Sequence, residues 1–134
     1  MSGGAPQPAA APADAAVALR GVTHRYGQAL ALHEVSLELP RGASIALVGP
    51  DGVGKSTLLA LAAGVKRIQS GGVLTLGQDL ADARGRAALA ARVAFMPQGL
   101  GHNLYPTLSV AENVDFFARL FGLGARERQA RQAR

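Results

Sequence analysis

The fold of this chain is decided by the stretch Gly49-Pro50-Asp51-Gly52-Val53-Gly54-Lys55-Ser56. It has the complete spacing Gly-x-x-x-x-Gly-Lys-Ser of a phosphate-binding loop. An almost wholly apolar run, residues 44–48, precedes it, and leucines at helical spacing follow it. Strand, glycine loop and helix, in this order, are the context in which the spacing binds phosphate. The stretch therefore predicts a buried strand over residues 44–48, a phosphate-binding loop, and a helix over residues 56–63 that ends at Gly64.

The residue types in this stretch suit the phosphates of a nucleotide. Gly52 and Gly54 permit the backbone angles with which amide groups surround a bulky anion. The following helix adds its unpaired first-turn amides and the positive end of its dipole. We expect Lys55 to lie across the terminal phosphates, the Ser56 hydroxyl to coordinate a bridging Mg²⁺, and Thr57 to contact the phosphates nearer the sugar. The predicted ATP-binding residues of the loop are Gly49, Pro50, Asp51, Gly52, Val53, Gly54, Lys55, Ser56 and Thr57.

Further strands and helices are indicated on both sides of the loop by alternating or helical apolar patterns. Ser109 and Glu112 form a capping box, which marks the start of a helix that runs to about Phe121. A turn is predicted over residues 40–42. The predicted strands cover residues 17–22, 35–39, 73–76 and 92–96, and a further helix covers residues 81–91.

Composition narrows the function classes. The chain has 134 residues, room for one domain, with no cysteine and with apolar runs too short for a membrane span. The net charge of +5 comes from scattered arginines, which favours a solvated surface over a nucleic-acid interface. Residues 1–16 are rich in Ala and Pro and are expected to form a disordered leader.

Three further segments resemble the ATP-binding cassette (ABC) ATPases. Tyr26, in Arg25-Tyr26-Gly27, matches the family's aromatic that stacks on adenine. Gln98, in Phe95-Met96-Pro97-Gln98, matches the glutamine loop, whose Gln contacts Mg²⁺ and the attacking water. The segment Leu104-Tyr105-Pro106-Thr107-Leu108-Ser109-Val110-Ala111-Glu112-Asn113 is similar to the one that leads into the helical subdomain and touches the membrane partner in transporters. The resemblance thus implies catalytic roles for Lys55 and Gln98, and Ser56 and Gln98 as metal ligands.

A closer resemblance points to one branch of the family. The loop, residues 96–101 (Met-Pro-Gln-Gly-Leu-Gly) and residues 112–122 (Glu-Asn-Val-Asp-Phe-Phe-Ala-Arg-Leu-Phe-Gly) look like the first cassette of bacterial ribosome-associated ATPases. Those proteins place two cassettes before a membrane segment related to ABC-2 exporters. The implied fold is α/β, a P-loop NTPase of the ABC ATPase type in truncated form. It would combine a mixed sheet, whose antiparallel part comes from the first strands, a phosphate-loop core and the start of the helical subdomain.

The sequence lacks several motifs of the family, and their absence limits the activity that we expect. The signature motif Leu-Ser-Gly-Gly-Gln is absent, as is the apolar run followed by Asp-Glu (Walker B) that supplies the catalytic base. His24, His33 and His102 all lie before the region where the switch His would fall. We therefore expect residues 17–134 to form a partial ABC ATP-binding domain that binds ATP and Mg²⁺ without turning ATP over.

The resemblance implies a function in transport. A complete member would sandwich ATP with a second cassette, in a dimer or in tandem, and would drive export through a membrane-spanning ABC-2 type domain or subunit. That role implies a cytoplasmic location at the inner face of the cell membrane. The alternative is a ribosome-associated ATPase acting in translation, with the ribosome as partner. A small P-loop kinase and a non-catalytic nucleotide sensor are further alternatives.

Overall fold

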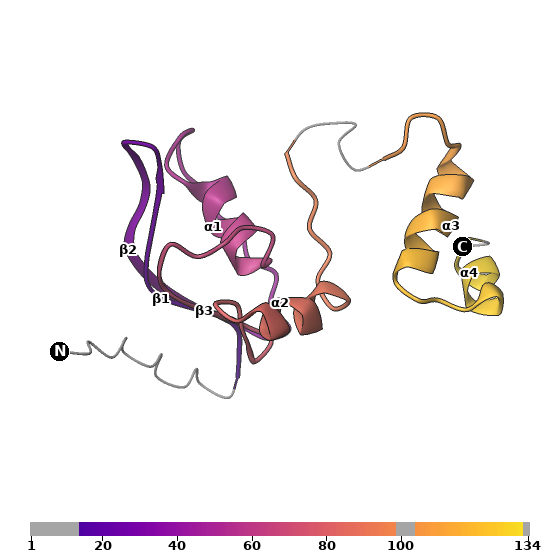
Figure 1. Ribbon diagram of the computed structural model, residues 1–134, viewed down its shortest axis with the longest axis horizontal. Helices are drawn as coiled ribbons and strands as arrows, with labels where there is room; N and C mark the ends of the chain where they lie inside the picture. The colour runs from indigo at the N-terminus through magenta and orange to yellow at the C-terminus, as the bar shows by residue number, and fades with distance from the viewer. Residues whose placement is uncertain (1–13, 99–103, 133–134) are drawn as a thin grey trace. The chain divides into compact units, whose positions relative to one another are not determined.

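The computed structural model describes residues 14–98 and 104–132, and the chain falls into two compact units. The first unit comprises residues 1–95 and the second residues 96–134. Figure 1 shows the first unit from indigo to orange, with its sheet and helices α1 (Lys55–Ala62) and α2 (Ala83–Ala90). The second unit runs from orange to yellow, with helices α3 (Val110–Leu120) and α4 (Ala125–Gln132).

A four-stranded antiparallel sheet forms the first unit, in the order β2-β1-β3-β4. The long hairpin of β1 (Ala15–Tyr26) and β2 (Ala29–Pro40) confirms the first two predicted strands and extends them. Its other strands are β3 (Ser70–Thr75) and β4 (Gln78–Asp79). The first two residues of β1 fall within the predicted leader, and residues 1–13 lie outside the described part. The sheet confirms the predicted antiparallel part.

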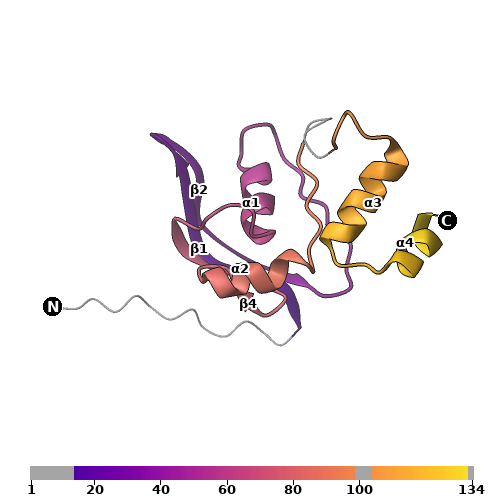
Figure 2. The same ribbon diagram turned by 45° about the vertical axis from the view of Figure 1, so that its right-hand side comes forward.

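Helix α1 (Lys55–Ala62) packs on this sheet, as Figure 2 shows, and creates the core of the unit. Leu61 from the helix and Leu19, Val22 and Val73 from the strands are wholly buried. Gly64 ends the helix in the left-handed conformation, with φ of 74°, and donates from its amide to Leu61 O. This confirms the predicted helix and its glycine cap. α1 is thereby fixed against the strand that ends at Tyr26.

Two predicted strands are wrong. Residues 44–48 and 92–96 belong to no strand among the described residues, and Val48 is 89% exposed rather than buried. An apolar extended segment becomes a strand only when a neighbour supplies a hydrogen-bond ladder. No described segment pairs with either run, so the parallel part of the predicted mixed sheet is not seen within residues 14–98 and 104–132. Helix α2 (Ala83–Ala90) confirms the prediction for residues 81–91, with the Asp82 carboxylate as its N-cap.

The second unit contains α3 (Val110–Leu120) and α4 (Ala125–Gln132). The capping box is confirmed, because Ser109 Oγ accepts from the Glu112 amide while Glu112 Oε2 accepts from the Ser109 amide. Asp115 joins the two helices through ion pairs with Arg119 on its own helix and Arg128 on α4. Throughout the part of the chain that the structure describes, each helix is too short or too polar to cross a membrane.

Candidate functional site

The predicted phosphate-binding loop lies between the end of β2 and the start of α1 and is open to solvent over residues 49–53. Gly52 and Gly54 both adopt positive φ angles, 81° and 92°. A Cβ atom on Gly54 would lie 2.2 Å from the carbonyl oxygen of Ala31 and 2.8 Å from Leu32 Cδ2. Glycine at position 54 is therefore required twice, by its conformation and by the close approach of strand β2.

Lys55 folds back across the loop. Its Nζ donates to the carbonyl oxygens of Gly49, at 2.7 Å, and Pro50, at 2.5 Å, and lies 3.9 Å from the Asp51 carboxylate. The side chain retains 26% of its exposure, so the ammonium is partly desolvated over the mouth of the loop. A cation held by neutral carbonyls and one exposed carboxylate is available to a polyphosphate, which offers stronger charge-assisted hydrogen bonds.

The N-terminus of α1 presents its positive end to the same loop. Its N-cap is Gly54, which provides no side-chain hydrogen bond, and no acidic residue stands in the first turn. The first amides of a helix have no partner within the helix, and anions bind there because these amides and the dipole both favour negative charge. Ser56 is exposed in this turn, while Thr57 is 7% exposed.

Tyr26 stands beside this helix end. Its hydroxyl lies 3.1 Å from Thr57 Oγ1, although 31 residues separate the two in sequence. Half of Tyr26 is exposed, and the edge-on ring of His24 lies 5.0 Å from its ring. The hydrogen bond with Thr57, and secondly the hydrogen bond with Lys66, lower the pKa of the Tyr26 phenol. The structure thus brings the predicted base platform and the last residue of the phosphate-binding stretch together.

Three residues around Tyr26 were not predicted as part of the site. Lys66 Nζ lies 4.8 Å from the centre of the Tyr26 ring, and the Gln69 amide pairs with the backbone of Arg25. His24 is buried, and burial, followed by the charge of Lys66, lowers its pKa. None has a motif of its own. The only feature of the sequence that could have pointed to Lys66 is that Lys55 and Lys66 are the sole lysines of the chain.

Gln98 lies in the second unit, at an exposed bend that follows an extended segment. The predicted part of Gln98 in catalysis and metal binding stays a prediction. Residues 99–101 of the segment quoted above lie outside the described residues. Across residues 14–98 and 104–132, no group of three or more His, Cys, Asp or Glu side chains is arranged to hold a metal.

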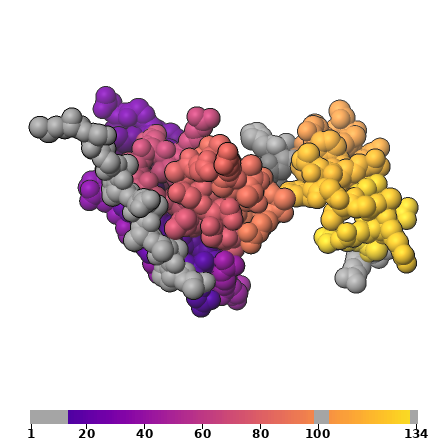
Figure 3. Space-filling view, turned by 60° about the horizontal axis from the view of Figure 1, so that its bottom comes forward, coloured from indigo at the N-terminus to yellow at the C-terminus, as the bar shows by residue number. Residues whose placement is uncertain are grey.

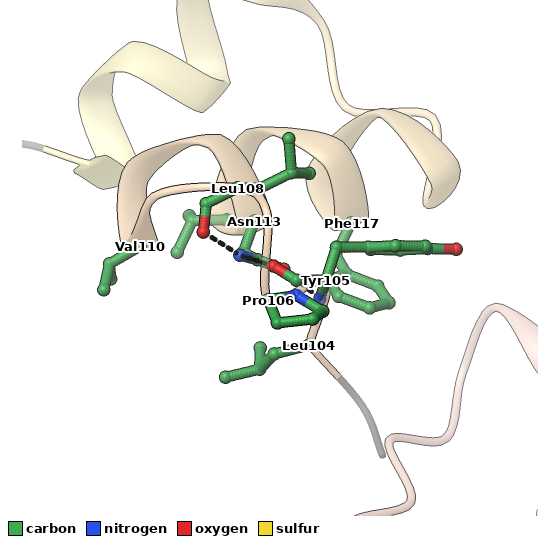
Figure 4. Close-up of a pocket in the computed structure, with 8 residues that line it drawn as sticks. Leu104, Tyr105, Pro106, Leu108, Val110, Asn113 and Phe117 are labelled. Carbon is green, nitrogen blue, oxygen red and sulfur yellow. Dashed lines mark hydrogen bonds between the residues drawn. The ribbon is translucent and has the colours of Figure 1, made fainter. Parts of the chain in front are cut away.

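The segment predicted to touch a membrane partner forms a hollow with helix α3 in the second unit. The pocket has a volume of about 440 Å³ and is shown in Figure 4. Its walls are almost entirely apolar, and among its lining residues are Leu104, Pro106, Val110 and Phe117. Such a surface suits the apolar side of a protein partner better than a charged ligand.

Asn113 holds the shape of this hollow. It is buried, and its Nδ2 donates to the carbonyl oxygens of Tyr105, Leu108 and Ser109 at 3.0 to 3.1 Å. Its Oδ1 accepts from the Tyr105 amide at 2.8 Å. One side chain therefore pairs with backbone groups of Tyr105, Leu108 and Ser109 in the turn that leads into α3, part of which is drawn in Figure 4.

Comparison of the sequence with known families gives one match. The ABC transporter family matches residues 32–134, which include the whole loop but begin after Tyr26. The sn-glycerol-3-phosphate import ATP-binding protein UgpC 1 of Rhizobium johnstonii is 36% identical over 117 residues, 87% of this chain and 30% of that protein. The phosphonates import ATP-binding protein PhnC of Frankia casuarinae is 44% identical over 101 residues, 74% of this chain and 39% of that protein.

Solved structures agree with this match. The dimeric bacterial ABC transporter cassette MJ0796 has a TM-score of 0.74 and 26% identity, covering 86% of this chain and 53% of that chain. CbiO1 from Clostridium perfringens, part of the ABC transporter complex cbiONQ, has a TM-score of 0.72 and 26% identity, covering 88% of this chain and 47% of its own. The chain spans about a third of the length of the two curated relatives and about half the length of these cassettes.

Proposed function

This chain belongs to the ABC transporter family, and on that basis we propose that it is the part of a cassette that binds MgATP. The phosphates are bound by the loop of residues 49–57, and the adenine base stacks on Tyr26. The fold supports this proposal because it is the α/β fold of the ABC ATPases. A further structural neighbour, with 26% identity and a TM-score of 0.72, was solved with ADP and Pi bound.

The observation that carries the proposal is the contact between Tyr26 and Thr57. Their hydroxyl oxygens lie 3.1 Å apart. The ring proposed to bind adenine is thus hydrogen-bonded to the first turn of α1, whose N-terminus favours phosphate. A nucleotide needs an aromatic surface for its base and an anion site for its phosphates within the length of one molecule. Tyr26 and the N-terminus of α1, which both belong to the first unit, support the proposal for this reason.

The residues of the site fit a magnesium ion that arrives with the nucleotide. Mg²⁺ prefers oxygen ligands and is held in such sites by one or two protein groups together with substrate phosphates. Ser56 presents a hydroxyl oxygen in the exposed first turn of α1, and Gln98 supplies an amide oxygen in the family pattern. When bound, the ion neutralises phosphate charge. Lys55 adds a fixed cation at the terminal phosphates, which lowers the cost of bringing the polyphosphate into the loop.

Binding without turnover is the activity we propose for these 134 residues. Lys55 and the helix end stabilise phosphate charge, but hydrolysis also requires a positioned group that accepts the proton of the attacking water. The family assigns that work to the glutamate of an Asp-Glu pair, and the sequence contains no such pair.

A membrane permease is the partner we propose for the second unit. The apolar hollow between residues 104–108 and helix α3 offers a surface for an apolar protein segment. Export, which the resemblance to ABC-2 systems implies, and import, the function in the names of the relatives, predict opposite directions of ATP-driven flux in inside-out vesicles. The ribosomal alternative has no support in these relatives, and we do not propose it.

Equilibrium binding combined with a phosphate-release assay tests the proposed function. We expect the chain to bind ATP saturably in the presence of Mg²⁺, to bind it more weakly after chelation of the metal, and to release no phosphate above the uncatalysed rate. Saturable binding with steady phosphate release would disprove the proposal of binding without turnover. Absence of ATP binding by a folded chain would overturn the assignment of the site.

A further inference from the structure

We propose that Lys66 is a residue of the base subsite, where its ammonium group holds the ring of Tyr26 as the platform for adenine. The inference rests on the proposed function, because it concerns how the same site binds ATP. Lys66 lies nine residues after the phosphate-binding stretch, in the loop between α1 and β3. The inference is drawn from three features of the structure, and each of these features restrains Tyr26 or the main chain next to it.

The first observation is the position of the ammonium group. Lys66 Nζ lies 4.8 Å from the centre of the Tyr26 ring, within the distance of about 6 Å at which a cation is attracted to an aromatic face. No carboxylate among residues 14–98 and 104–132 forms an ion pair with Lys66. The aromatic ring is thus the main counterpart of this charge in the part of the chain that the structure describes.

The second observation is that the backbone of Lys66 is tied to α1. The amides of Val65 and Lys66 donate to the carbonyl oxygen of Ala60, at 3.1 and 3.2 Å. Because α1 also carries Lys55 and Thr57, the main chain of Lys66 keeps a fixed relation to the phosphate-binding turn. The ring of Tyr26 is therefore held both by Thr57, in α1, and by Lys66, whose backbone is bonded to α1.

The third observation concerns Gln69, at the other end of the loop. Its Oε1 accepts from the Arg25 amide at 2.8 Å, and its Nε2 donates to the Arg25 carbonyl oxygen at 3.0 Å. This pair of hydrogen bonds imitates a ladder step and continues the pairing of β1 with β3 beyond Thr23 and Ser70. Gln69 thereby fixes the main chain next to Tyr26, and we assign it as a positioning residue.

These restraints have one consequence for binding. The hydroxyl of Tyr26 is held by Thr57, its ring contacts Lys66 and His24, and half of the residue still faces solvent. A ring fixed before the nucleotide arrives loses little conformational entropy when a base stacks on it. The charge of Lys66 also attracts the polyphosphate. The restrained ring and the positive charge of Lys66 both favour ATP binding. Removal of Lys66 should therefore weaken ATP binding.

The test compares variants of the whole chain at two neighbouring basic residues. Lys66→Met keeps the aliphatic stem and removes the charge, Lys66→Arg keeps a cation over the ring, and Arg67→Met removes an equal charge from the exposed next position. Dissociation constants are measured for ATP and for tripolyphosphate, which lacks the base. We expect Lys66→Met to weaken ATP binding by about 5-fold relative to Arg67→Met, with both variants equal toward tripolyphosphate, and Lys66→Arg to resemble the parent chain.

A spectroscopic measurement separates contact with the ring from a general loss of structure. The chain has two tyrosines and no tryptophan, so the phenol absorbance that disappears in Tyr26→Phe belongs to Tyr26. Lys66 lowers the pKa of this phenol, and Lys66→Met therefore raises it in the folded chain, whereas Arg67→Met leaves it unchanged. If Lys66→Met does not fold, the same comparison is made with Lys66→Gln.

The outcomes are distinct. The proposal is supported if Lys66→Met binds ATP more weakly than Arg67→Met does, binds tripolyphosphate as Arg67→Met does, and raises the pKa of Tyr26. ATP affinity equal to or higher than that of Arg67→Met overturns it, because the ammonium would then be neutral or would compete with adenine for the ring. If the parent chain binds neither ATP nor tripolyphosphate, the proposed function fails, and this inference fails with it.

Discussion

The hydroxyl group of Tyr26, at the end of strand β1, lies 3.1 Å from the hydroxyl group of Thr57, in the first turn of helix α1. The contact joins the antiparallel hairpin to the phosphate-binding turn. In the proposed function, a nucleotide would therefore meet a base platform that is already connected to its anion site. Because Thr57 is buried and Tyr26 is half exposed, the hydrogen bond joins a residue of the interior of the first unit to a residue on its surface.

Substitutions at Tyr26 separate the ring from its hydroxyl group. Tyr26→Phe keeps the ring and removes the hydrogen bonds of the hydroxyl group with Thr57 and Lys66, and we expect ATP affinity to change by less than about 5-fold, since the net contribution of a hydrogen bond within a protein is about 1 kcal/mol. Tyr26→Ala removes the stacking surface, worth about 1–3 kcal/mol, and should weaken ATP binding by about 5- to 150-fold. Calorimetric titration measures both. Equal affinity of Tyr26→Ala and the parent chain would exclude Tyr26 as the base platform.

Alanine substitutions at two glycines of the loop test its packing. Gly54→Ala places a Cβ atom 2.2 Å from the carbonyl oxygen of Ala31 at a φ of 92°, and we expect it to lower the free energy of unfolding by about 2–5 kcal/mol. Gly52→Ala has a φ of 81° but no atom within 4 Å, so only the conformational cost of about 1–2 kcal/mol applies. Thermal unfolding of the two variants gives the comparison. A smaller loss for Gly54→Ala than for Gly52→Ala would contradict the described packing against β2.

Asn113 is expected to be the most sensitive polar residue of the second unit. Asn113→Ala removes the acceptor of the Tyr105 amide and the donor to three carbonyl oxygens, at a cost of about 1–3 kcal/mol. Amide hydrogen exchange should speed up over residues 105–113. Val110→Ala, at an exposed position of the same helix, is the matched control and should leave exchange unchanged. Unaltered exchange in Asn113→Ala would mean that the turn does not depend on this side chain.

The stability of the second unit should depend on pH through Asp115. The hydrogen bond with Arg119 first, and that with Arg128 second, hold the pKa of this carboxyl below its ordinary value. Its contribution is therefore complete above the unfolded-state pKa of about 3.9 and is lost as the pH falls through the lower folded-state value.

Asp115→Asn removes this pH dependence while keeping the size of the side chain. Urea unfolding followed by far-ultraviolet circular dichroism should show the parent chain more stable than Asp115→Asn at about pH 6, with the difference shrinking as the pH falls below about 4. Glu112, whose pKa is lowered by the Ser109 hydroxyl and secondly by the Ser109 backbone, is intact in both proteins and does not affect the comparison. A difference that is constant with pH would contradict the role given to the ion pairs.

Local signals in the sequence predicted much of the first unit and the start of the second. Gly64 as a helix end and Ser109 with Glu112 as a capping box are determined by residues close in sequence, and both are confirmed. The glycine loop was predicted for the same reason, because its chemistry depends on eight consecutive residues. The resemblance further implied a role for Tyr26 near the loop, and the structure places it at Thr57.

Features that depend on distant partners were not predictable in this way. Residues 44–48 have the composition of a buried strand, but strand formation requires a ladder from another segment, and none of the described segments supplies one. Lys66 is 40 residues away from Tyr26 in sequence and Gln69 is 44 residues away from Arg25, and a single lysine or glutamine in a loop carries no pattern. The position of Gln69 follows from the pairing of β1 with β3, and that of Lys66 from its backbone hydrogen bond to Ala60 of α1.

The most direct test of the central claim is the dissociation constant of MgATP for the parent chain and for Lys55→Met, measured by calorimetry. Lys55 bonds only to carbonyl oxygens and one carboxylate of its own exposed loop, so its removal should leave thermal unfolding unchanged. If the loop binds the phosphates, Lys55→Met should weaken MgATP and tripolyphosphate alike by about 10- to 150-fold, as the loss of a charge-assisted hydrogen bond predicts. Equal MgATP affinity in the two folded proteins would show that nucleotide does not bind at this loop.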